Sequence, residues 1–335
     1  MKNAYIKDIA VYLPHSVLTN EDLEKEFPEW TAQKIFDKVG IKSRHIAAVD
    51  ETALDMTEKA CNALFSQNTA TKDTVDFILL CTQSADYKLP TSACILQHRL
   101  GLLSSVGALD FNLGCSGYCY GLALAKGLIV GGMAQNVLLV TSETYSKYLH
   151  PLDKGNRCLF GDAATATLVS SEGFARIGEC IFGTDGSGAE SLIVKNGGAR
   201  NPFSAANAVS YDDAGHIVSP NHLYMDGAGI FSFTLKRVPK MLKSLLEKSL
   251  LSMEDIDFFV FHQANAYMLS HLQKKLKISD DRFVLCIEDV GNTVSSTIPL
   301  ALFRLRKEKS LEGKKHICTL GFGVGLSWAG AMIDI

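Results

Sequence analysis

Short apolar, strand-forming runs alternate with longer segments of helical periodicity along most of the chain. The four clearest strand candidates occupy residues 77–81, 137–141, 258–261 and 316–320. Helical patterns cover residues 53–66, 116–133, 233–249 and 297–309. Strands that alternate with helices in this way predict an α/β fold with largely parallel sheets, because parallel neighbours need a crossover between them.

The two halves of the chain carry the same order of features. A helical segment leads into the strand pattern at 75–83 in the first half, and another leads into 256–263 in the second. Further on, Leu113-Gly-Cys115 matches Val290-Gly-Asn292 at nearly the same separation, and a helical segment follows each. Two matched segments in one order indicate a duplicated unit, although α/β proteins also repeat strand–helix patterns without duplication.

The division between the halves is expected near residue 170, after a strand pattern at 163–169. This gives an N-terminal half at 1–170 and a C-terminal half at 171–335. A polar, irregular segment at 196–225 reads as a long excursion inside the second half. Loops of this length are usually functional or mobile.

Composition and charge narrow the possible classes of protein. The 335 residues are 47% hydrophobic and 21% charged, with a net charge of −3, as in an ordinary globular protein. That charge gives no reason to expect nucleic acid as a partner, and no apolar run reaches the ~18 residues of a membrane span. The first residues lack the apolar stretch of a secretory signal. We therefore expect a cytoplasmic protein without membrane insertion.

One of the nine cysteines has a setting that favours reactivity. The cysteines include no C-x-x-C pair, so we expect reduced thiols and no bound metal. Cys115 lies between two glycines in Asn112-Leu-Gly-Cys-Ser-Gly-Tyr118, directly before a helical pattern. A helix N-terminus favours the thiolate and lowers the thiol pKa. The alternative is a small cysteine packed at a tight turn.

Two further residues gain meaning from the duplication. His262 follows the strand pattern at 258–261, and Asn292 lies at a glycine turn in the position that corresponds to Cys115. Taken alone, the histidine fits structural hydrogen bonding and the asparagine fits a turn or helix cap. A pseudo-twofold arrangement brings the two turns together and predicts one site built from all three residues.

The segment Gly321-Phe-Gly-Val-Gly325 carries three alternate glycines before the last strand pattern. It lacks the context of a dinucleotide site and the lysine of a P-loop. Glycines at this spacing let backbone amides approach a neighbour closely. We therefore interpret the segment as part of an oxyanion hole near Cys115.

Taken in order, these residues resemble the ketoacyl-ACP synthase III family of the thiolase superfamily. The resemblance runs nearly end to end through Tyr12-Leu-Pro14, Glu29-Trp30, Gly40-Ile41, Arg44-His-Ile-Ala47, Cys115-Ser-Gly117, Phe160-Gly-Asp162, His262-Gln-Ala-Asn265 and Gly291-Asn-Thr293. It implies an α/β, thiolase-like duplicated five-layer αβαβα fold and a homodimer.

The resemblance also implies a two-stage reaction. Cys115 takes an acyl group from acyl-CoA as a thioester, which is nucleophilic catalysis. Malonyl-ACP then loses carbon dioxide, and its enolate attacks the thioester to give 3-ketoacyl-ACP. His262 and the Asn292 amide would stabilise the enolate, and the backbone of Cys115, Gly323 and Val324 would hold the acyl oxyanion. No cofactor is implied, since CoA and phosphopantetheine enter with the substrates.

The residues implied for binding depart in part from the family's usual pattern. The resemblance assigns the contacts with CoA or carrier protein to four residues, Trp30, Lys34, Lys154 and Asn265. The two lysines keep the charge of the usual arginines but lose the bidentate fork. Tyr267 stands where another arginine is common. Leu89 replaces a phenylalanine that often closes the acyl pocket, in a loop placed at the dimer interface, so primers longer than acetyl are expected.

Other functions share parts of this pattern. A thiolase-fold acyltransferase would move the acyl group to a hydroxyl, amine or specialised-metabolite acceptor, but an enolate-stabilising Asn292 has little purpose there. A papain-like hydrolase has Cys, His and Asn in this order without the duplicated plan. A degradative thiolase needs a second cysteine near the last glycine loop, whereas Cys318 lies in the strand pattern before it. A non-catalytic partner subunit would usually have lost the cysteine.

Overall fold

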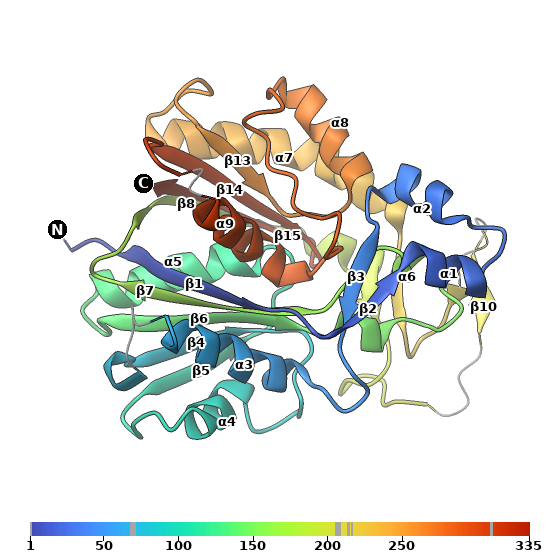
Figure 1. Ribbon diagram of the computed structural model, residues 1–335, viewed down its shortest axis with the longest axis horizontal. Coiled ribbons are helices and arrows are strands. Elements are labelled where there is room, and N and C mark those ends of the chain that lie inside the picture. Colours follow the sequence, from blue (N-terminus) through green and yellow to red (C-terminus); the bar gives the residue numbers. More distant parts are fainter. Residues whose placement is uncertain (1, 68–71, 205–208, 213–214, 216, 309–310) are drawn as a thin grey trace.

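The computed structural model describes residues 2–67, 72–204, 209–212, 215, 217–308 and 311–335. One large sheet dominates it (Figure 1). Its strands are β1 (Tyr5–Tyr12), β4 (Phe77–Cys81), β5 (Gly107–Phe111), β6 (Asn136–Glu143), β7 (Ala163–Ser170), β8 (Ala175–Thr184), β13 (Phe258–Phe261), β14 (His316–Gly323) and β15 (Ser327–Asp334). Their order across the sheet is β13-β14-β15-β8-β1-β7-β6-β4-β5.

The remaining strands form small pairs, and the helices connect and cover the sheets. The pairs are β2 (Ser16–Thr19) with β3 (Ser43–Ile46), β9 (Leu192–Val194) with β12 (Leu223–Met225), and β10 (Ser210–Tyr211) with β11 (Ile217–Val218). The helices are α1 (Asn20–Glu26), α2 (Ala32–Val39), α3 (Ala53–Phe65), α4 (Ser92–Arg99), α5 (Gly117–Val130), α6 (Lys154–Arg157), α7 (Gly227–Ser249), α8 (Ala266–Leu276) and α9 (Thr297–Lys307).

Every strand and helix pattern used in the prediction falls on one of these elements. The largest difference in a boundary is at α7, which begins at Gly227 and not at residue 233. Asp226 caps its first turn by accepting a hydrogen bond from the Gly229 amide at 2.9 Å. The first turn of α7 consists mostly of small residues without helical periodicity, so the sequence pattern does not predict it. Residue 309, the predicted end of the last helix, lies outside the described residues.

The sheet repeats one plan on either side of the β1–β8 pair. β1, β7, β6 and β4 follow one another in one direction, as β8, β15, β14 and β13 do in the other. Phe283 bridges to Phe259 in parallel, as β5 pairs with β4 in the first half. The predicted duplication is therefore confirmed. The division at residue 170 falls between β7 and β8 and stays a prediction.

The expectation of largely parallel pairing is wrong. Only the β4–β5, β4–β6 and β13–β14 pairs of the large sheet are parallel. The pairs from β6 through β7, β1, β8 and β15 to β14 are antiparallel. Connectivity explains the β14–β15 pair, because a short turn joins these two strands and leaves no room for a crossover helix. β1 lies between β7 and β8 and is antiparallel to both.

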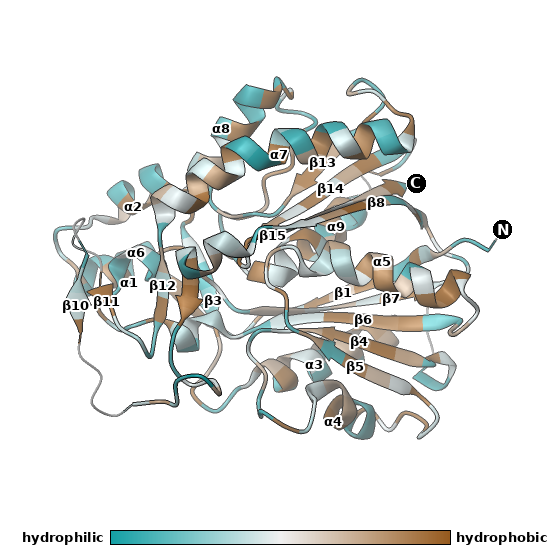
Figure 2. Cartoon of the chain, turned by 180° about the vertical axis from the view of Figure 1, so that it is seen from behind, coloured by the Kyte–Doolittle hydropathy of each residue, from teal (hydrophilic) through white to brown (hydrophobic). Residues whose placement is uncertain are grey.

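The two halves of the sheet enclose a central helix layer, which gives five layers in all (Figure 1). α3 and α4 cover one outer face, α7 and α8 cover the other, and α5 and α9 lie between the halves. α5 is apolar over most of its surface, as expected for a helix packed between two sheets. In Figure 2 the strands are mostly apolar, whereas α7 and α8 alternate between apolar and polar residues.

The smaller elements gather at one end of this layered body. α1, α2, α6, β2 and β3 lie beyond the same end of the sheet (Figure 1). β9 and β12 also lie at this end, and Leu192 and Met225 from them line a cavity together with His262, which follows β13. In the part of the chain that the structure covers, no helix has the length and apolar character needed to cross a membrane.

Candidate active site

Cys115 lies in the turn between β5 and α5, one residue before the helix cap Ser116. Its side chain is buried. Glycine is needed on both sides, because a Cβ on Gly114 would lie 2.6 Å from Gln83 Oε1 and one on Gly117 would lie 2.3 Å from Cys81 Sγ. The tight turn predicted from the sequence is therefore present, with the thiol at the start of a helix.

The glycine-rich segment formed by the end of β14 and the turn before β15 passes directly over this turn. A Cβ on Gly323 would lie 2.9 Å from Cys115 Sγ, and one on Gly321 would lie 2.5 Å from the Cys115 carbonyl oxygen. The backbone N–H groups of Cys115 and Val324 face the thiol, and both act to lower its pKa. These two amides form a candidate oxyanion hole, in which Gly323 provides the close approach and Val324 the second donor.

His262 follows β13 and is fully enclosed. Its backbone N–H donates to the Leu320 carbonyl of β14 at 2.8 Å. Its ring Nδ1 lies 2.8 Å from Thr297 Oγ1, at the first residue of α9. Because Thr297 holds Nδ1, Nε2 is the ring nitrogen left for a substrate. Burial lowers the pKa of His262 to about 3, against a weaker opposing contact with the Val294 backbone, so the ring is neutral.

Asn292 is held in a turn that fixes both its backbone and its amide. Gly291 has φ +67°, a left-handed conformation that favours glycine. The Asn292 N–H donates to the Leu159 carbonyl at 2.8 Å, and the Gly161 N–H donates to the Asn292 carbonyl at 3.1 Å. The side-chain Oδ1 accepts the Val294 N–H at 2.9 Å. The side-chain NH2 group is therefore the part of Asn292 that remains as a donor.

The structure brings Cys115, His262 and Asn292 to the wall of one cavity of about 80 Å³. The rest of the wall is mostly apolar and includes Tyr145, Leu192, Met225, Ile230, Met268 and Phe322. Met225 closes the predicted excursion at 196–225, so this segment forms part of the cavity wall. Cys318, by contrast, is buried in β14 and does not line the cavity.

The expected low pKa of Cys115 is wrong for the resting protein. Burial, followed by the nearby Glu143 carboxylate, raises the pKa of this thiol to about 12. The amides of Cys115 and Val324 offset only part of that effect, and the neutral His262 ring supplies no positive charge. The resting site therefore holds a thiol and a neutral imidazole.

Glu143 is a buried acid near the thiol that the sequence reasoning missed. Its carboxylate accepts hydrogen bonds from Ser84 Oγ at 2.9 Å and from Ser295 Oγ at 3.1 Å. Burial raises its pKa to about 8. It joins the loop after β4 to the turn that follows Asn292. In the sequence, the one sign of a buried acid at this place is a glutamate at the end of an apolar strand pattern.

A larger pocket of about 440 Å³ adjoins the small cavity and shares Leu159, Met225, Gly227 and Asn265 with it. Trp30 lines this outer pocket, and its contact with CoA or carrier protein stays a prediction. Asn265 lies between the two spaces, and its side chain also caps α8 by accepting the Met268 N–H at 2.8 Å. Tyr267 lines the outer pocket and is 55% exposed.

Three lysines lie near Trp30, and the roles of Lys34 and Lys154 in binding CoA or carrier protein stay predictions. Lys154 Nζ lies 5.7 Å from the Trp30 ring centre and pairs with Glu29 at 2.6 Å. Neither Lys34 nor Lys154 is part of the pocket wall, and Lys34 contacts the Glu29 carbonyl at 3.3 Å. Lys38, which was not predicted, lines the pocket with its Nζ 4.7 Å from the Trp30 ring centre. Leu89 is 82% exposed in a loop before α4, and its role in an acyl pocket stays a prediction.

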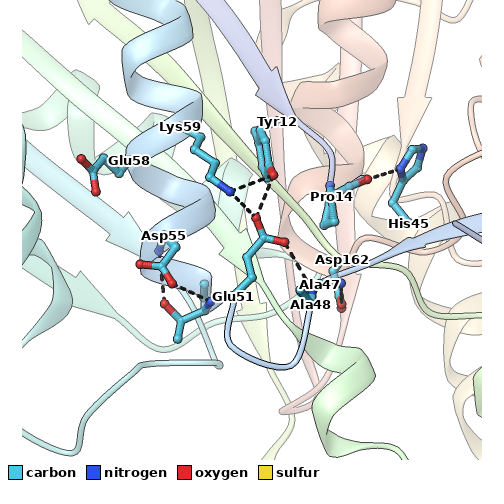
Figure 3. Close-up of polar contacts among 12 residues, drawn as sticks. Tyr12, Pro14, His45, Ala47, Ala48, Glu51, Asp55, Glu58, Lys59 and Asp162 are labelled. Carbon is cyan, nitrogen blue, oxygen red and sulfur yellow. Dashed lines mark hydrogen bonds and ion pairs between the residues drawn. The ribbon is translucent and has the colours of Figure 1, made fainter. Parts of the chain in front are cut away.

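A separate polar pocket lies beside α3 and shares no lining residue with the catalytic cavity. Figure 3 shows its central contacts, in which Glu51 accepts hydrogen bonds from Tyr12 Oη at 2.7 Å and from Lys59 Nζ at 2.6 Å. Asp55 pairs with Arg99 at 2.7 Å. These two ion pairs tie α3 to the loop before it and to α4, which is a structural role.

The fold and the cavity define a thiolase-like enzyme with a cysteine, a histidine and an asparagine in the wall of one cavity. The family model for 3-oxoacyl-[acyl-carrier-protein (ACP)] synthase III matches residues 109–186, and the model for its C-terminal part matches residues 246–335. The chain belongs to the beta-ketoacyl-[acyl-carrier-protein] synthase III family.

Individual relatives agree over the whole length. The chain is 35% identical to the beta-ketoacyl-[acyl-carrier-protein] synthase III of Clostridium perfringens, and the match covers 100% of both chains. A crystal structure of a 3-oxoacyl-(acyl-carrier-protein) synthase III is 52% identical, with a TM-score of 0.96 over 99% of this chain and 100% of that one. The 3-oxoacyl-(acyl-carrier protein) synthase from Burkholderia xenovorans LB400 is 36% identical, with a TM-score of 0.90 over 99% and 94%.

Proposed function

We propose that this protein condenses an acyl-CoA primer with malonyl-ACP, with loss of carbon dioxide, to give 3-ketoacyl-ACP in fatty acid biosynthesis. One observation carries the proposal. A thiol, a neutral imidazole and an oriented amide surround a single small cavity, which adjoins a larger pocket beside Trp30. The large pocket would receive the phosphopantetheine arm of CoA or of the carrier protein, and the small one is where the thioester carbon would meet Cys115.

In the first stage Cys115 Sγ attacks the thioester carbon of acyl-CoA. The new carbon–sulfur bond forms, the bond to the CoA sulfur breaks, and the acyl oxygen carries negative charge between the two steps. The amides of Cys115 and Val324 are aimed at the thiol and would stabilise that charge. With a pKa of about 12 the thiol must lose its proton as it attacks, and neutral His262 is the base that can take it and return it to the CoA sulfur.

In the second stage malonyl-ACP occupies the same cavity. Loss of carbon dioxide leaves an enolate whose oxygen needs hydrogen-bond donors. Asn292 meets this need because Val294 occupies its Oδ1 and leaves the NH2 group free to donate. Thr297 Oγ1 lies close to both His262 Nδ1 and the Val294 carbonyl, so it can donate to the ring or accept from it. His262 Nε2 can therefore serve as an acceptor in the first stage and as an N–H donor in the second.

The acyl acceptor distinguishes this function from simple acyl transfer. A transfer to a hydroxyl or an amine forms no enolate, and the fixed amide of Asn292 would then have no chemical purpose. The reaction uses no metal and no bound cofactor, because CoA and phosphopantetheine arrive as parts of the substrates. The family relationship favours the same assignment.

The proposal includes a cytoplasmic homodimer. β5 is the last strand of the large sheet, so one of its edges has no partner strand within the described residues. Leu124 of α5 and Phe182 of β8 are 44% and 50% exposed and line an apolar groove. An exposed apolar surface of this kind is typical of an interface between subunits. All nine cysteines are free thiols, in agreement with a reducing compartment.

Mass spectrometry of the intact protein tests the proposal. Incubation with acetyl-CoA should add one acetyl group to the peptide that contains Cys115, and addition of malonyl-ACP should then remove it and yield 3-ketoacyl-ACP with carbon dioxide. A Cys115→Ala protein should gain no thioester. Acyl transfer to another acceptor without carbon dioxide release, or acylation of the Cys115→Ala protein, would overturn the assignment.

A further inference from the structure

One hydroxyl in the wall of the catalytic cavity has no hydrogen-bond partner. Thr234 belongs to α7, is completely buried and lines the cavity together with Cys115, His262 and Asn292. Its Oγ1 makes no hydrogen bond with any residue that the structure describes. Leaving a buried hydroxyl unpaired destabilises a fold, so an unpaired hydroxyl at a reaction site calls for a functional explanation.

The helix offers this hydroxyl a partner that it does not use. A threonine inside a helix can donate to the carbonyl group four residues earlier. Thr57, which is equally buried in α3, does so, with its Oγ1 2.8 Å from the Ala53 carbonyl oxygen. Thr234 makes no such bond to the carbonyl of Ile230. Its hydroxyl is therefore left for a molecule in the cavity.

Thr234 lies at the inner end of a face of α7 that leads from the outer pocket into the cavity. Gly227, Ile230 and Thr234 are three and four residues apart, so they share one face of the helix, and all three line the cavity. Of these three, Gly227 alone also lines the outer pocket. Thr234 lies about 10 Å further along the helix axis. A substrate arm that enters past Gly227 therefore brings its reacting end toward Thr234.

The inner end of this face belongs to the side of the cavity that His262 and Phe322 form. Val238, one turn after Thr234, packs in the same apolar cluster as Phe322. The Phe322 ring lies edge-on to the His262 ring, with centroids 5.8 Å apart. Cys115 belongs to a different apolar cluster. These neighbours place Thr234 on the side of the cavity that acts in the second stage.

Malonyl-ACP brings a carboxylate into a cavity that offers it no basic side chain. Among the described residues, no lysine or arginine lines this cavity. His262 and Asn292 are assigned to the thioester oxygen, so the carboxylate needs another donor. The Tyr145 hydroxyl, which also faces the cavity, already donates to Gln83. Thr234 provides the wall hydroxyl that remains free to donate.

We propose that the Thr234 hydroxyl donates a hydrogen bond to the carboxylate of the malonyl group and orients it for decarboxylation. The inference rests on the proposed function, since it concerns the second substrate of that reaction. The bond between the carboxylate carbon and the α-carbon breaks, carbon dioxide leaves, and the electron pair moves into the thioester as an enolate. Thr234 keeps its proton throughout.

An uncharged donor suits this step. The breaking bond must stand perpendicular to the thioester plane for its electron pair to enter the carbonyl group, and a hydrogen bond to the carboxylate can hold this orientation. A lysine or arginine would bind the carboxylate more strongly than the departing carbon dioxide. It would therefore stabilise the substrate more than the transition state and slow the reaction.

Thr234→Val removes the hydroxyl and keeps the shape of the side chain. Acylation of Cys115 by acetyl-CoA should be unchanged. The kcat/KM for malonyl-ACP, measured as carbon dioxide release by the acylated enzyme, should fall by roughly tenfold or more, because a hydrogen bond to a charged group is lost. Thr234→Ser should restore most of it. Thr234→Val should also be at least as stable as wild type in urea unfolding, because it removes an unpaired buried hydroxyl.

Ser249→Ala is the matched control. Ser249 is the last residue of α7, and its hydroxyl is also buried without a partner but does not line the cavity. This variant should leave both stages unchanged. Acetyl-ACP, which carries the same arm without the carboxylate, should compete with malonyl-ACP equally well in wild type and Thr234→Val.

Three results would overturn the inference. They are unchanged malonyl-ACP kinetics in Thr234→Val, an equal loss of acylation and condensation in that variant, or weaker competition by acetyl-ACP to the same extent as the loss for malonyl-ACP. Failure of acetyl-CoA to label Cys115 in the wild-type protein would instead overturn the proposed function.

Discussion

The side-chain oxygen of Asn292 accepts the backbone N–H of Val294 at 2.9 Å, and this contact decides what Asn292 offers to a substrate. An amide has one acceptor end and one donor end. With the acceptor end occupied by its own chain, the donor end is left for the cavity. The residue is thereby prepared for an oxygen that gains negative charge.

Asn292→Asp should separate the two stages of the reaction. The aspartate can still accept the Val294 N–H, but it replaces the donor with a negatively charged oxygen. Condensation should fall by roughly a hundredfold or more, as expected for loss of one donor to a developing oxyanion. Acylation of Cys115 should persist. The measurements are acyl-enzyme mass and carbon dioxide release, and normal condensation by this variant would show that the Asn292 amide does not stabilise the enolate.

The reactivity of Cys115 should depend strongly on pH in the absence of substrate. Burial holds its pKa at about 12, well above that of a free thiol, so the thiol form persists as the pH rises past neutrality. The rate of alkylation by iodoacetamide should rise roughly tenfold for each pH unit from 7 upward, because only the thiolate reacts. Peptide mapping after timed labelling gives the rate. A plateau already reached near pH 7 would indicate a stabilised thiolate instead.

The same shift has a consequence for stability. The folded state holds the Cys115 proton more tightly than the unfolded chain does, so its contribution is fully present below the pKa of a free thiol. It is lost progressively as the pH rises from that value toward about 12. Cys115→Ala should lose less stability than wild type between pH 8 and pH 10 in urea unfolding, and equal losses would contradict the assigned shift.

Thr297 should act as the positioning residue of His262. Thr297→Ser keeps the hydroxyl beside Nδ1 and should retain most activity. Thr297→Val removes it, takes away the hydroxyl partner of the buried Nδ1, and should lower both stages by roughly tenfold or more. The pH profile of acylation should also shift in Thr297→Val, since the tautomer of the ring is no longer set. Identical profiles for the valine and serine variants would limit Thr297 to a packing role.

Leu89 carries the prediction about primers. Leu89→Phe should move the primer preference toward acetyl. The larger ring would take up space at the subunit interface that a longer acyl chain could fill, and each acyl methylene buried there gains about 0.8 kcal/mol. The comparison is kcat/KM for acetyl-, propionyl- and butyryl-CoA with both proteins. A wild type confined to acetyl-CoA, or two identical profiles, would show that Leu89 does not contribute to the acyl pocket.

The sequence predicted the residues whose local setting carries a signal. Cys115 and Asn292 lie at glycine turns in matching halves, and His262 follows an apolar strand, so each leaves a trace along the chain. Thr297, Thr234 and Glu143 leave none, because their roles come from surroundings that residues far away in sequence provide. No local pattern separates a buried glutamate or threonine at a reaction site from one that merely packs.

The lysines near Trp30 show the same limit of prediction from sequence. Lys34 and Lys38 lie one helical turn apart on α2, on the same face. Only the way α2 docks on its neighbours decides which ammonium group reaches the ring, and that is a tertiary property. The pKa of Cys115 shows a similar limit, because the helix end is visible in the sequence but the burial around the thiol is not.

The passage of the glycine segment over Cys115 has a consequence for how the two sheet halves depend on each other. One oxyanion donor comes from the nucleophile's own turn, and the other comes from Val324, between β14 and β15. A chain cut between β7 and β8 would leave the thiol on one fragment and Val324, His262 and Asn292 on the other. Neither fragment alone would hold a complete reaction centre, so recovery of activity on mixing them would report directly on how well the two sheet halves dock.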